Sequence, residues 1–205
     1  MILQTLTVGP FGTNCYLVFR EKSGELFIVD PADEGKKIVA AAKKHPFRSA
    51  RILLTHAHVD HISAAGEVAS ALGIPAAELD PDDREMYRSP TNAIPPYFPA
   101  ATDLPPVKDF APAEGLTVLK LPGHTRGGSG FLFEEGEEKF LLSGDTLFCA
   151  SVGRTDLYGG NYGELITSIR EKLLTLPDDL EFYPGHGEPS TIGFEKRNNP
   201  YLNQE

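Results

Sequence analysis

The pattern of apolar and polar positions along the chain predicts a mixed α/β protein. Short apolar runs bounded by turn residues predict strands over 3–8, 14–19, 26–29 and 51–54, and again over 116–121, 129–133, 139–142 and 180–183. Helical spacing predicts helices over 34–44, 61–72 and 162–174, and a shorter capped helix over 190–197. A further short strand is predicted over 74–77.

Strands with helices between and after them recur in both halves of the chain. This order suggests an α/β fold of four layers, an αβ/βα sandwich. The length of 205 residues suits one domain, and a hydrophobic fraction of 40% is enough for a sizeable core. We therefore expect a single domain over residues 1–205.

Residues 80–112 break this pattern. They hold eight of the seventeen prolines, with aromatic residues such as Tyr97 and Phe98 scattered among them. Proline at this density blocks regular helix and central strand. Two interpretations stay open: a proline-rich covering loop, or a lid whose aromatic side chains, Tyr97 among them, contact a substrate.

Composition restricts the partners. The formal net charge of -10 argues against nucleic acid, because binding a phosphate backbone requires clustered Lys and Arg. No apolar run approaches the ~20 residues of a membrane helix. The first residues lack a basic region ahead of an apolar one, so no secretory signal is expected. We expect a cytoplasmic protein with neither nucleic acid nor membrane as a partner; its oligomeric state is not readable from the sequence.

The two cysteines, Cys15 and Cys149, have no metal-binding or redox spacing. A reducing compartment suits them. We expect both to pack as small buried hydrophobic side chains, although Cys149 lies close to the candidate ligand Asp145.

Five of the six histidines lie in loops that directly follow predicted strands. These loops are Thr55-His56-Ala57-His58-Val59-Asp60-His61, Pro122-Gly123-His124 and Pro184-Gly185-His186, and Gly144-Asp145 forms a fourth loop with a carboxylate. Imidazoles and carboxylates gathered at strand ends are typical of metal sites. The sixth histidine, His45, is expected to be an ordinary side chain at a helix end.

The spacing within the first loop indicates two metal ions. His56 and His58 are two apart in an extended segment and point to the same side, whereas Asp60 and His61 are adjacent and diverge. A single tetrahedral zinc would need only three protein ligands and a water. We expect one metal to be bound by His56, His58 and His124, the other by Asp60, His61 and His186, and Asp145 to lend one oxygen to each.

These four loops resemble the metallo-β-lactamase superfamily, and are most similar to its glyoxalase II-like (hydroxyacylglutathione hydrolase-like) members. The resemblance runs from Asn14 to Leu202 and implies the αβ/βα sandwich with two divalent metal ions, zinc with iron or manganese as alternatives. All seven metal ligands of the glyoxalase II pattern are present, namely His56, His58, Asp60, His61, His124, Asp145 and His186.

The activity implied by the resemblance is hydrolysis of a small-molecule thioester, such as S-acylglutathione, by a hydroxide that bridges the two metals. Asp60 is expected to orient that hydroxide. Asp30, at a strand end, either holds a ligand histidine or begins an ordinary Asp-Pro turn.

Several positions depart from the glyoxalase II pattern. Full-length glyoxalase II carries a C-terminal helical domain that helps to bind glutathione. The present chain stops soon after Leu202, so this domain is expected to be missing. Glu188 stands two residues past the last predicted histidine ligand, where the glyoxalase II family has a tyrosine. Arg154 lies near the family's basic glutathione contact and either anchors the substrate or pairs with Asp156. Arg126 stands where proline is frequent, and either reaches an anionic substrate or is solvated.

Other functions remain open. Persulfide dioxygenases resemble this chain over Gly153 to Asp156 and bind one iron through counterparts of His56, His124 and Asp145. A lactonase and a non-catalytic metal scaffold or sensor are further alternatives. A β-lactamase is disfavoured by the pairing of Asp60 with Asp145, and a nuclease by the acidic composition.

Overall fold

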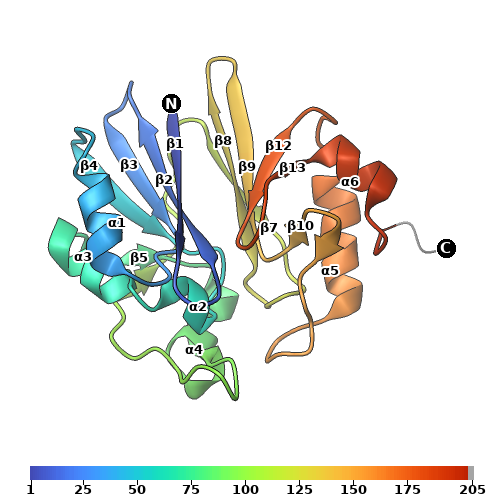
Figure 1. Cartoon of the computed structure of the whole chain (residues 1–205), viewed down its shortest axis with the longest axis horizontal. Coiled ribbons are helices and arrows are strands. Elements are labelled where there is room, and N and C mark those ends of the chain that lie inside the picture. The colour runs from blue at the N-terminus through green and yellow to red at the C-terminus, as the bar shows by residue number, and fades with distance from the viewer. Residues whose placement is uncertain (203–205) are drawn as a thin grey trace. The chain divides into compact units, whose positions relative to one another are not determined.

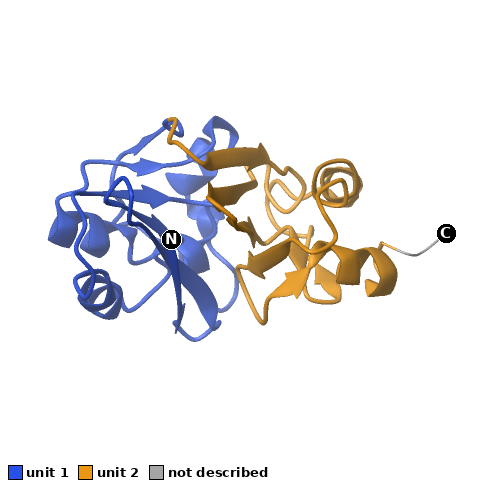
Figure 2. Cartoon of the chain, turned by 90° about the horizontal axis from the view of Figure 1, so that it is seen from above, with its two compact units in different colours: residues 1–111 blue, residues 112–205 orange. Residues whose placement is uncertain are grey.

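The computed structural model describes residues 1–202. The chain forms two compact units, unit 1 over residues 1–111 and unit 2 over residues 112–205, coloured separately in Figure 2. The boundary falls at the end of the proline-rich segment. Each unit contains a sheet and helices, as the strand and helix pattern predicts, and the assignment of the whole chain to one domain stays a prediction.

The sheet of unit 1 has the strand order β1-β2-β3-β4-β5-β6. These strands span Ile2–Val8, Thr13–Arg20, Glu25–Val29, Ser49–Leu53, Ala77–Glu78 and Val107–Lys108. The first three pair antiparallel, whereas β3, β4, β5 and β6 run parallel. Because Val29 pairs with Leu53, the residues that follow β3 and β4 leave the sheet at the same edge.

The helices α1 (Gly35–Ala42) and α3 (Ala65–Leu72) lie side by side along the sheet of unit 1 (Figure 1). Every residue of β2 is buried, and Ile38 of α1 and Val68 of α3 are fully enclosed in the same core. Burying an aliphatic side chain of this size contributes about 1.5–3 kcal/mol. This core fixes the sheet edge from which the loops after β3 and β4 emerge.

The helix predicted over 61–72 is in fact two helices, α2 (Val59–Ile62) and α3. The amide of Ala64 donates to the carbonyl of Pro31 at 3.0 Å instead of continuing the helical ladder. The hydroxyl of Ser63 donates back to the Val59 carbonyl at 2.6 Å, a contact that often bends helices. The strand predicted over 74–77 is observed three residues later, at Ala77–Glu78, since the amide of Ile74 closes α3 by donating to the carbonyl of Ala69.

The proline-rich segment is more ordered than a plain covering loop. It contains one-turn helices at Pro81–Asp83, Arg84–Tyr87 (α4) and Pro90–Asn92, and the edge strand β6. Two prolines stand at the first position of such turns, where a missing N–H costs nothing. Buried Asn92 ties the segment together, because its side chain donates to Tyr87 and accepts from the amide of Ala101.

The sheet of unit 2 has the strand order β13-β12-β9-β8-β7. These strands span Ser190–Thr191, Glu181–Pro184, Glu138–Gly144, Ser129–Glu135 and Leu116–Lys120. Strand β9 runs parallel to β12, and β7 runs antiparallel to β8, which runs antiparallel to β9. Strands β7, β9 and β12 therefore share one direction, and the loops after them leave the same edge of this sheet.

Helix α5 (Tyr162–Ser168) continues into a wider helical turn at Ile169–Leu173. The amide of Leu174 donates to the carbonyl of Ile169 and closes this turn, so the helical segment ends where the sequence predicts, at residue 174. Helix α6 (Ile192–Asn198) begins at Thr191, whose hydroxyl accepts from the amide of Phe194. Both helices lie against the sheet of unit 2 (Figure 1). None of the helices within residues 1–202 is long and apolar enough to cross a bilayer.

The hairpin of β10 (Leu147–Phe148) and β11 (Ser151–Val152) has no counterpart in the predicted elements. Cys149 and Ala150 form its turn, with Ala150 at φ 52°. Cys149 is therefore exposed, and the expectation that it packs as a buried side chain is wrong. Cys15 is buried as expected, and burial raises the pKa of its thiol well above the usual range.

Candidate metal centre

The first group of predicted ligands lies in unit 1, in the loop between β4 and α3. The imidazole rings of His56 and His58 have centroids 4.9 Å apart, and those of His56 and His61 lie 4.2 Å apart. All three imidazoles are buried. The Asp60 carboxylate, with 10% of its side chain exposed, has Oδ2 at 3.8 Å from Nε2 of His61. The sequence motif therefore folds into one compact cluster of possible ligand atoms.

Asp30 stands at the centre of the contacts that hold this group. Its Oδ2 lies 2.9 Å from Nδ1 of His61, and Oδ1 accepts the amide of Thr55 at 2.7 Å. A carboxylate acceptor requires the proton of His61 on Nδ1, so Nε2 carries the lone pair that a metal ligand needs. Of the two alternatives for Asp30, the structure shows the one in which it holds His61, a predicted ligand.

Thr55 is a member of this network that the sequence analysis did not single out. Its hydroxyl donates to Oδ2 of Asp30 at 2.6 Å and lies 3.0 Å from Nδ1 of His56. Buried Asp83 accepts the amide of Ala57 at 3.2 Å and holds the loop from its other side. The position of Thr55 directly before the histidine motif is the signal that could have identified it.

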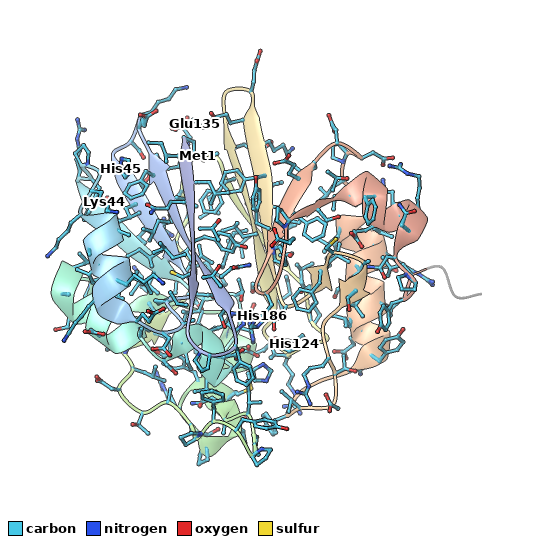
Figure 3. All side chains as sticks on the ribbon, viewed as in Figure 1. Met1, Lys44, His45, His124, Glu135 and His186 are labelled. Atoms are coloured by element: carbon cyan, nitrogen blue, oxygen red, sulfur yellow. The ribbon has the colours of Figure 1, made fainter. Side chains whose placement is uncertain are left out.

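The second group of predicted ligands lies in unit 2, in the loops after β7, β9 and β12. Nε2 of His124 and Nε2 of His186 lie 3.6 Å and 3.5 Å from Oδ2 of Asp145. The two histidines lie at the same end of the unit 2 sheet (Figure 3). Both face one oxygen of the carboxylate, and the prediction that Asp145 gives one oxygen to each metal remains a prediction.

The backbone carbonyl of Arg154 orients His124. Nδ1 of this histidine lies 2.7 Å from that oxygen, which places its proton on Nδ1 and leaves Nε2 to face Asp145. Arg154 therefore orients His124 through its main-chain carbonyl, a contact that no sequence motif reveals.

Two glycines allow the unit 2 loops to approach each other. A Cβ on Gly153 would lie 1.9 Å from the carbonyl oxygen of Asp145. A Cβ on Gly123, at φ 136°, would lie 2.2 Å from Cα of Leu165 in α5. Both distances are far inside van der Waals contact, so the loops that carry His124 and Asp145 require glycine at these positions.

The side chains predicted to contact substrate are those of Arg154 and Tyr97. The Arg154 guanidinium donates to both carboxylate oxygens of Asp156, at 2.7 Å and 2.8 Å, so the loop salt bridge foreseen as one alternative is present. Tyr97, in the proline-rich segment, is 73% exposed. A substrate-binding role for either residue remains a prediction. His45 stacks near Phe19 with ring centroids 4.6 Å apart, an ordinary contact as expected.

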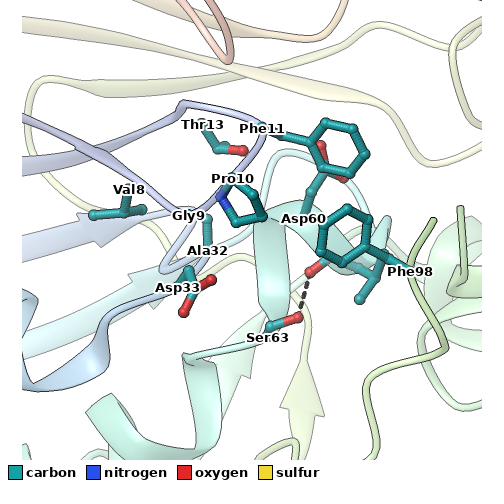
Figure 4. A pocket seen from close by; sticks show the side chains of 11 residues that line it. Val8, Gly9, Pro10, Phe11, Thr13, Ala32, Asp33, Asp60, Ser63 and Phe98 are labelled. Carbon is teal, nitrogen blue, oxygen red and sulfur yellow. Dashed lines mark hydrogen bonds between the residues drawn. The ribbon is translucent and has the colours of Figure 1, made fainter.

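A small recess opens beside Asp60 within unit 1. Figure 4 shows the rings of Phe11 and Phe98 side by side next to Asp60, with centroids 4.5 Å apart. Phe11 comes from the β1–β2 turn and Phe98 from the proline-rich segment. The remaining walls are mostly apolar, and no Lys or Arg lines the recess; the full set is Val8, Gly9, Pro10, Phe11, Thr13, Ala32, Asp33, Val59, Asp60, Ser63 and Phe98.

The donor atoms of both groups fit divalent metal ions. Two ligands of a tetrahedral ion with bonds of about 2.0–2.2 Å lie roughly 3.3–3.6 Å apart, as the Asp145 contacts do. The hydrogen bonds from His61 to Asp30 and from His124 to the Arg154 carbonyl are those that metal-bound histidines make with their second nitrogen. Imidazole and carboxylate ligands suit zinc, iron and manganese.

The family comparison agrees with this donor set. The model of the metallo-β-lactamase superfamily matches residues 8–186 of the chain, which include all seven predicted ligands. A curated relative, the hydroxyacylglutathione hydrolase GloC of Haemophilus influenzae, is 34% identical over 219 residues, with 100% of each chain covered.

Three solved structures are similar over nearly the whole chain. TTHA1623 in a di-iron-bound form is 37% identical with a TM-score of 0.86, covering 97% of this chain and 100% of its own. The BLEG-1 B3 metallo-beta-lactamase is 30% identical with a TM-score of 0.85, covering 99% and 100%. ETHE1 from Myxococcus xanthus is 26% identical with a TM-score of 0.75, covering 100% and 86%.

These likenesses confirm the predicted fold class, a mixed α/β fold of metallo-β-lactamase type. They also agree with the resemblance to glyoxalase II-like hydrolases that the motifs carry. The chain belongs to the metallo-β-lactamase superfamily of metal-dependent hydrolases.

Proposed function

We propose that this protein hydrolyses small-molecule thioesters of the S-acylglutathione type with two divalent metal ions. The observation that carries the proposal is the pair of hydrogen bonds that direct Nε2 of His61 and Nε2 of His124 towards carboxylates. A relative named as a hydroxyacylglutathione hydrolase supports the thioester. A neighbour named as di-iron-bound supports two ions, and zinc or manganese would suit the same ligands.

The proposed ligands are the seven that the sequence predicts. His56, His58 and His124 would hold one ion, Asp60, His61 and His186 the other, and Asp145 would join them. When bound, the ions would supply a water acidified to near neutral pKa and a Lewis acid for the thioester carbonyl.

Each protein group then has a definite task. Asp60 would accept a hydrogen bond from the attacking water and orient it, since its carboxylate lies between His61 and the recess. Asp30 would keep the proton of His61 on Nδ1 throughout the reaction. The thiol carrier leaves as a thiolate, with a parent pKa of about 8.5, and therefore needs little help from a general acid.

The recess beside Asp60 is proposed to hold the acyl group. Its aromatic and aliphatic walls favour an uncharged group, whereas Asp33 and Asp60 would repel an acyl chain that ends in a carboxylate. This assignment is consistent with a small metabolite, and not a macromolecule, as the substrate.

An iron-dependent persulfide dioxygenase, the class that the sequence resembles over Gly153 to Asp156, is the alternative, and ETHE1 from Myxococcus xanthus is a structural neighbour. The Gly-Arg-Thr-Asp segment at 153–156 does not decide between the two reactions. Gly153 is required by its contact with the Asp145 carbonyl, and Arg154 pairs with Asp156; both are structural needs that either enzyme would share.

The test is metal analysis of the purified protein together with a substrate panel. The panel holds an S-acylglutathione, a lactone, a β-lactam and glutathione persulfide, the last followed with an oxygen electrode. The β-lactam is included because one neighbour is named a B3 metallo-beta-lactamase. Two equivalents of metal with thioester turnover support the proposal. Oxygen uptake with persulfide and no thioester turnover would replace it with the alternative, and bound metal without any turnover would indicate a scaffold or sensor.

A further inference from the structure

We propose that Arg126, stacked on Tyr158, binds the anionic group of the thiol carrier. The proposal rests on the thioesterase function above and deepens it. The sequence offers two arginines in unit 2 for this task, Arg126 and Arg154. Their surroundings differ, and that difference decides which of them is available to a substrate.

Arg154 already has a partner of the kind that a substrate would supply. It donates two hydrogen bonds to Asp156, with Nε and one terminal nitrogen on separate carboxylate oxygens. The side-chain hydrogen bond from Arg154 holds the pKa of Asp156 at about 2, so this carboxylate is ionised at neutral pH. A substrate carboxylate would have to displace an internal one of the same geometry.

Arg126 has no such competitor. Arg126 is exposed, and among residues 1–202 no carboxylate forms a salt bridge or hydrogen bond with its guanidinium. The guanidinium carbon instead lies 5.6 Å from the centroid of the Tyr158 ring. Contact with a ring face uses none of the five N–H donors of an arginine, so they remain able to bind an oxyanion.

Backbone hydrogen bonds order the loop that carries Arg126. The amide of Leu121 donates to Gly128 at 2.6 Å, and the amide of Gly123 donates to Thr125 at 2.9 Å. A Cβ built on Gly159 would lie 3.5 Å from Cγ of Arg126, so the arginine stem runs beside the backbone that leads from Tyr158. An ordered loop together with the contact to the Tyr158 ring reduces the conformational entropy that Arg126 loses when it binds an anion.

Position and chemistry connect Arg126 with the reaction. It follows the proposed ligand His124 by two residues on the same short loop. A planar guanidinium matches the two oxygens of a carboxylate or of a phosphate. The net charge of -10 would repel an anionic carrier at long range, so its recognition needs a local cation of this kind.

The proposal predicts a selective loss in the Arg126→Met variant, which keeps most of the apolar stem. Three thioesters with the same acyl group separate the sources of negative charge: S-acylglutathione with carboxylates, S-acyl-coenzyme A with phosphates, and S-acyl-N-acetylcysteamine with neither. We expect KM to rise about 5- to 50-fold for the anionic carrier that is the substrate, with kcat little changed, as loss of a charge-assisted hydrogen bond implies.

Matched variants sharpen the test. Arg197→Met removes an exposed arginine of unit 2 that contacts Asp178, and serves as the control for net charge. Tyr158→Phe should retain the anion affinity, because the ring face is kept, whereas Tyr158→Leu should weaken it in the same direction as Arg126→Met. A larger KM rise in Arg154→Met than in Arg126→Met, or an equal rise with the neutral thioester, would overturn the assignment.

A binding experiment separates this proposal from the proposed function. S-methylglutathione is a thioether that cannot be hydrolysed, and calorimetry gives its affinity for the wild type and for Arg126→Met without any turnover. Weaker binding to the variant in an enzyme without thioesterase activity would leave Arg126 supported and the proposed reaction rejected. Unchanged binding and unchanged KM in an active thioesterase would reject Arg126 alone.

Discussion

Oδ2 of Asp30 lies 2.9 Å from Nδ1 of His61, although 31 positions separate the two residues in sequence. The contact arises because β3 and β4 are parallel and in register, so the residues after them leave the sheet together. Asp30 adopts φ 50°, a conformation unusual for a residue other than glycine, and in it the carboxylate contacts both Thr55 and His61. A structural feature of the sheet edge thereby sets the tautomer of a proposed metal ligand.

Replacing Asp30 with Ala should weaken metal binding without removing a ligand. His61 would lose the acceptor for its Nδ1 proton, and loss of such a partner typically lowers metal affinity about 10- to 100-fold. Competition with a chromophoric chelator measures the change. Asp82→Ala, at an exposed position in the first turn of the proline-rich segment, is the control. Equal affinities of the Asp30 variant and the wild type would show that Asp30 has no influence on the ligands.

Replacing Asp145 with Ala should strip or scramble the metals. The variant would leave Nε2 of His124 and of His186 without the carboxylate that both now face. Metal content by mass spectrometry and thioester turnover should fall together, whereas Asp179→Ala, at an exposed position of the same unit, should change neither. Full metal content with full activity in Asp145→Ala or in His124→Ala would mean that the ligand assignment is wrong.

Replacing Gly153 with Ala should destabilise unit 2 and disturb Asp145. The added methyl would lie 1.9 Å from the Asp145 carbonyl oxygen, and overpacking of this kind costs about 1–3 kcal/mol. Thermal denaturation should show a Tm lower by roughly 2–10 °C. Gly163→Ala in α5 is the matched control, because its methyl would meet nothing closer than 3.4 Å and should be neutral or stabilising. A Gly153 variant as stable as the control would contradict the close approach.

Replacing Phe98 with Ala should change the preference for the acyl group. The substitution removes one of the two rings beside Asp60 and enlarges the recess. The ratio of kcat/KM for a six-carbon acyl group to that for a two-carbon group should rise about 10-fold or more, since each buried methylene contributes about 0.8 kcal/mol. Phe194→Ala, at an exposed ring in α6, is the control. An unchanged ratio would place the acyl group elsewhere.

Replacing Arg154 with Met should raise the pKa of Asp156 from about 2 towards its ordinary value of 3.8, because the hydrogen bond from the Arg154 side chain is the main cause of the lowered pKa. Because the pKa of Asp156 is lower in the folded state than in the unfolded state, its ionised carboxylate stabilises the wild-type fold. This contribution is complete above pH 3.8 and is lost as the pH falls towards 2. Carboxyl NMR titration of the wild type and the variant measures the shift. An Asp156 that titrates identically in both would show that the salt bridge does not persist in solution.

The order of strands and helices could be read from the sequence because each element carries its own periodic pattern. Strands β1, β2, β3, β4, β7, β8, β9 and β12 lie close to their predicted positions. The elements that were misplaced depend on contacts from outside their own segment. Ala64 ends α2 because Pro31 captures its amide, and the β10–β11 hairpin is held to α6 where Glu195 accepts the amide of Ala150.

The sequence by itself determined the family, the fold class and the identity of the candidate ligands. Histidines and aspartates that follow predicted strands can be recognised from the sequence alone. They indicate one site because strands that run in the same direction end at the same edge of a sheet. Only the tertiary structure decided which groups orient those ligands and which arginine is unpaired. Asp30, Thr55 and the Arg154 carbonyl reach the histidines through space, and local sequence cannot encode a contact that parallel strands and glycine-tight loops create.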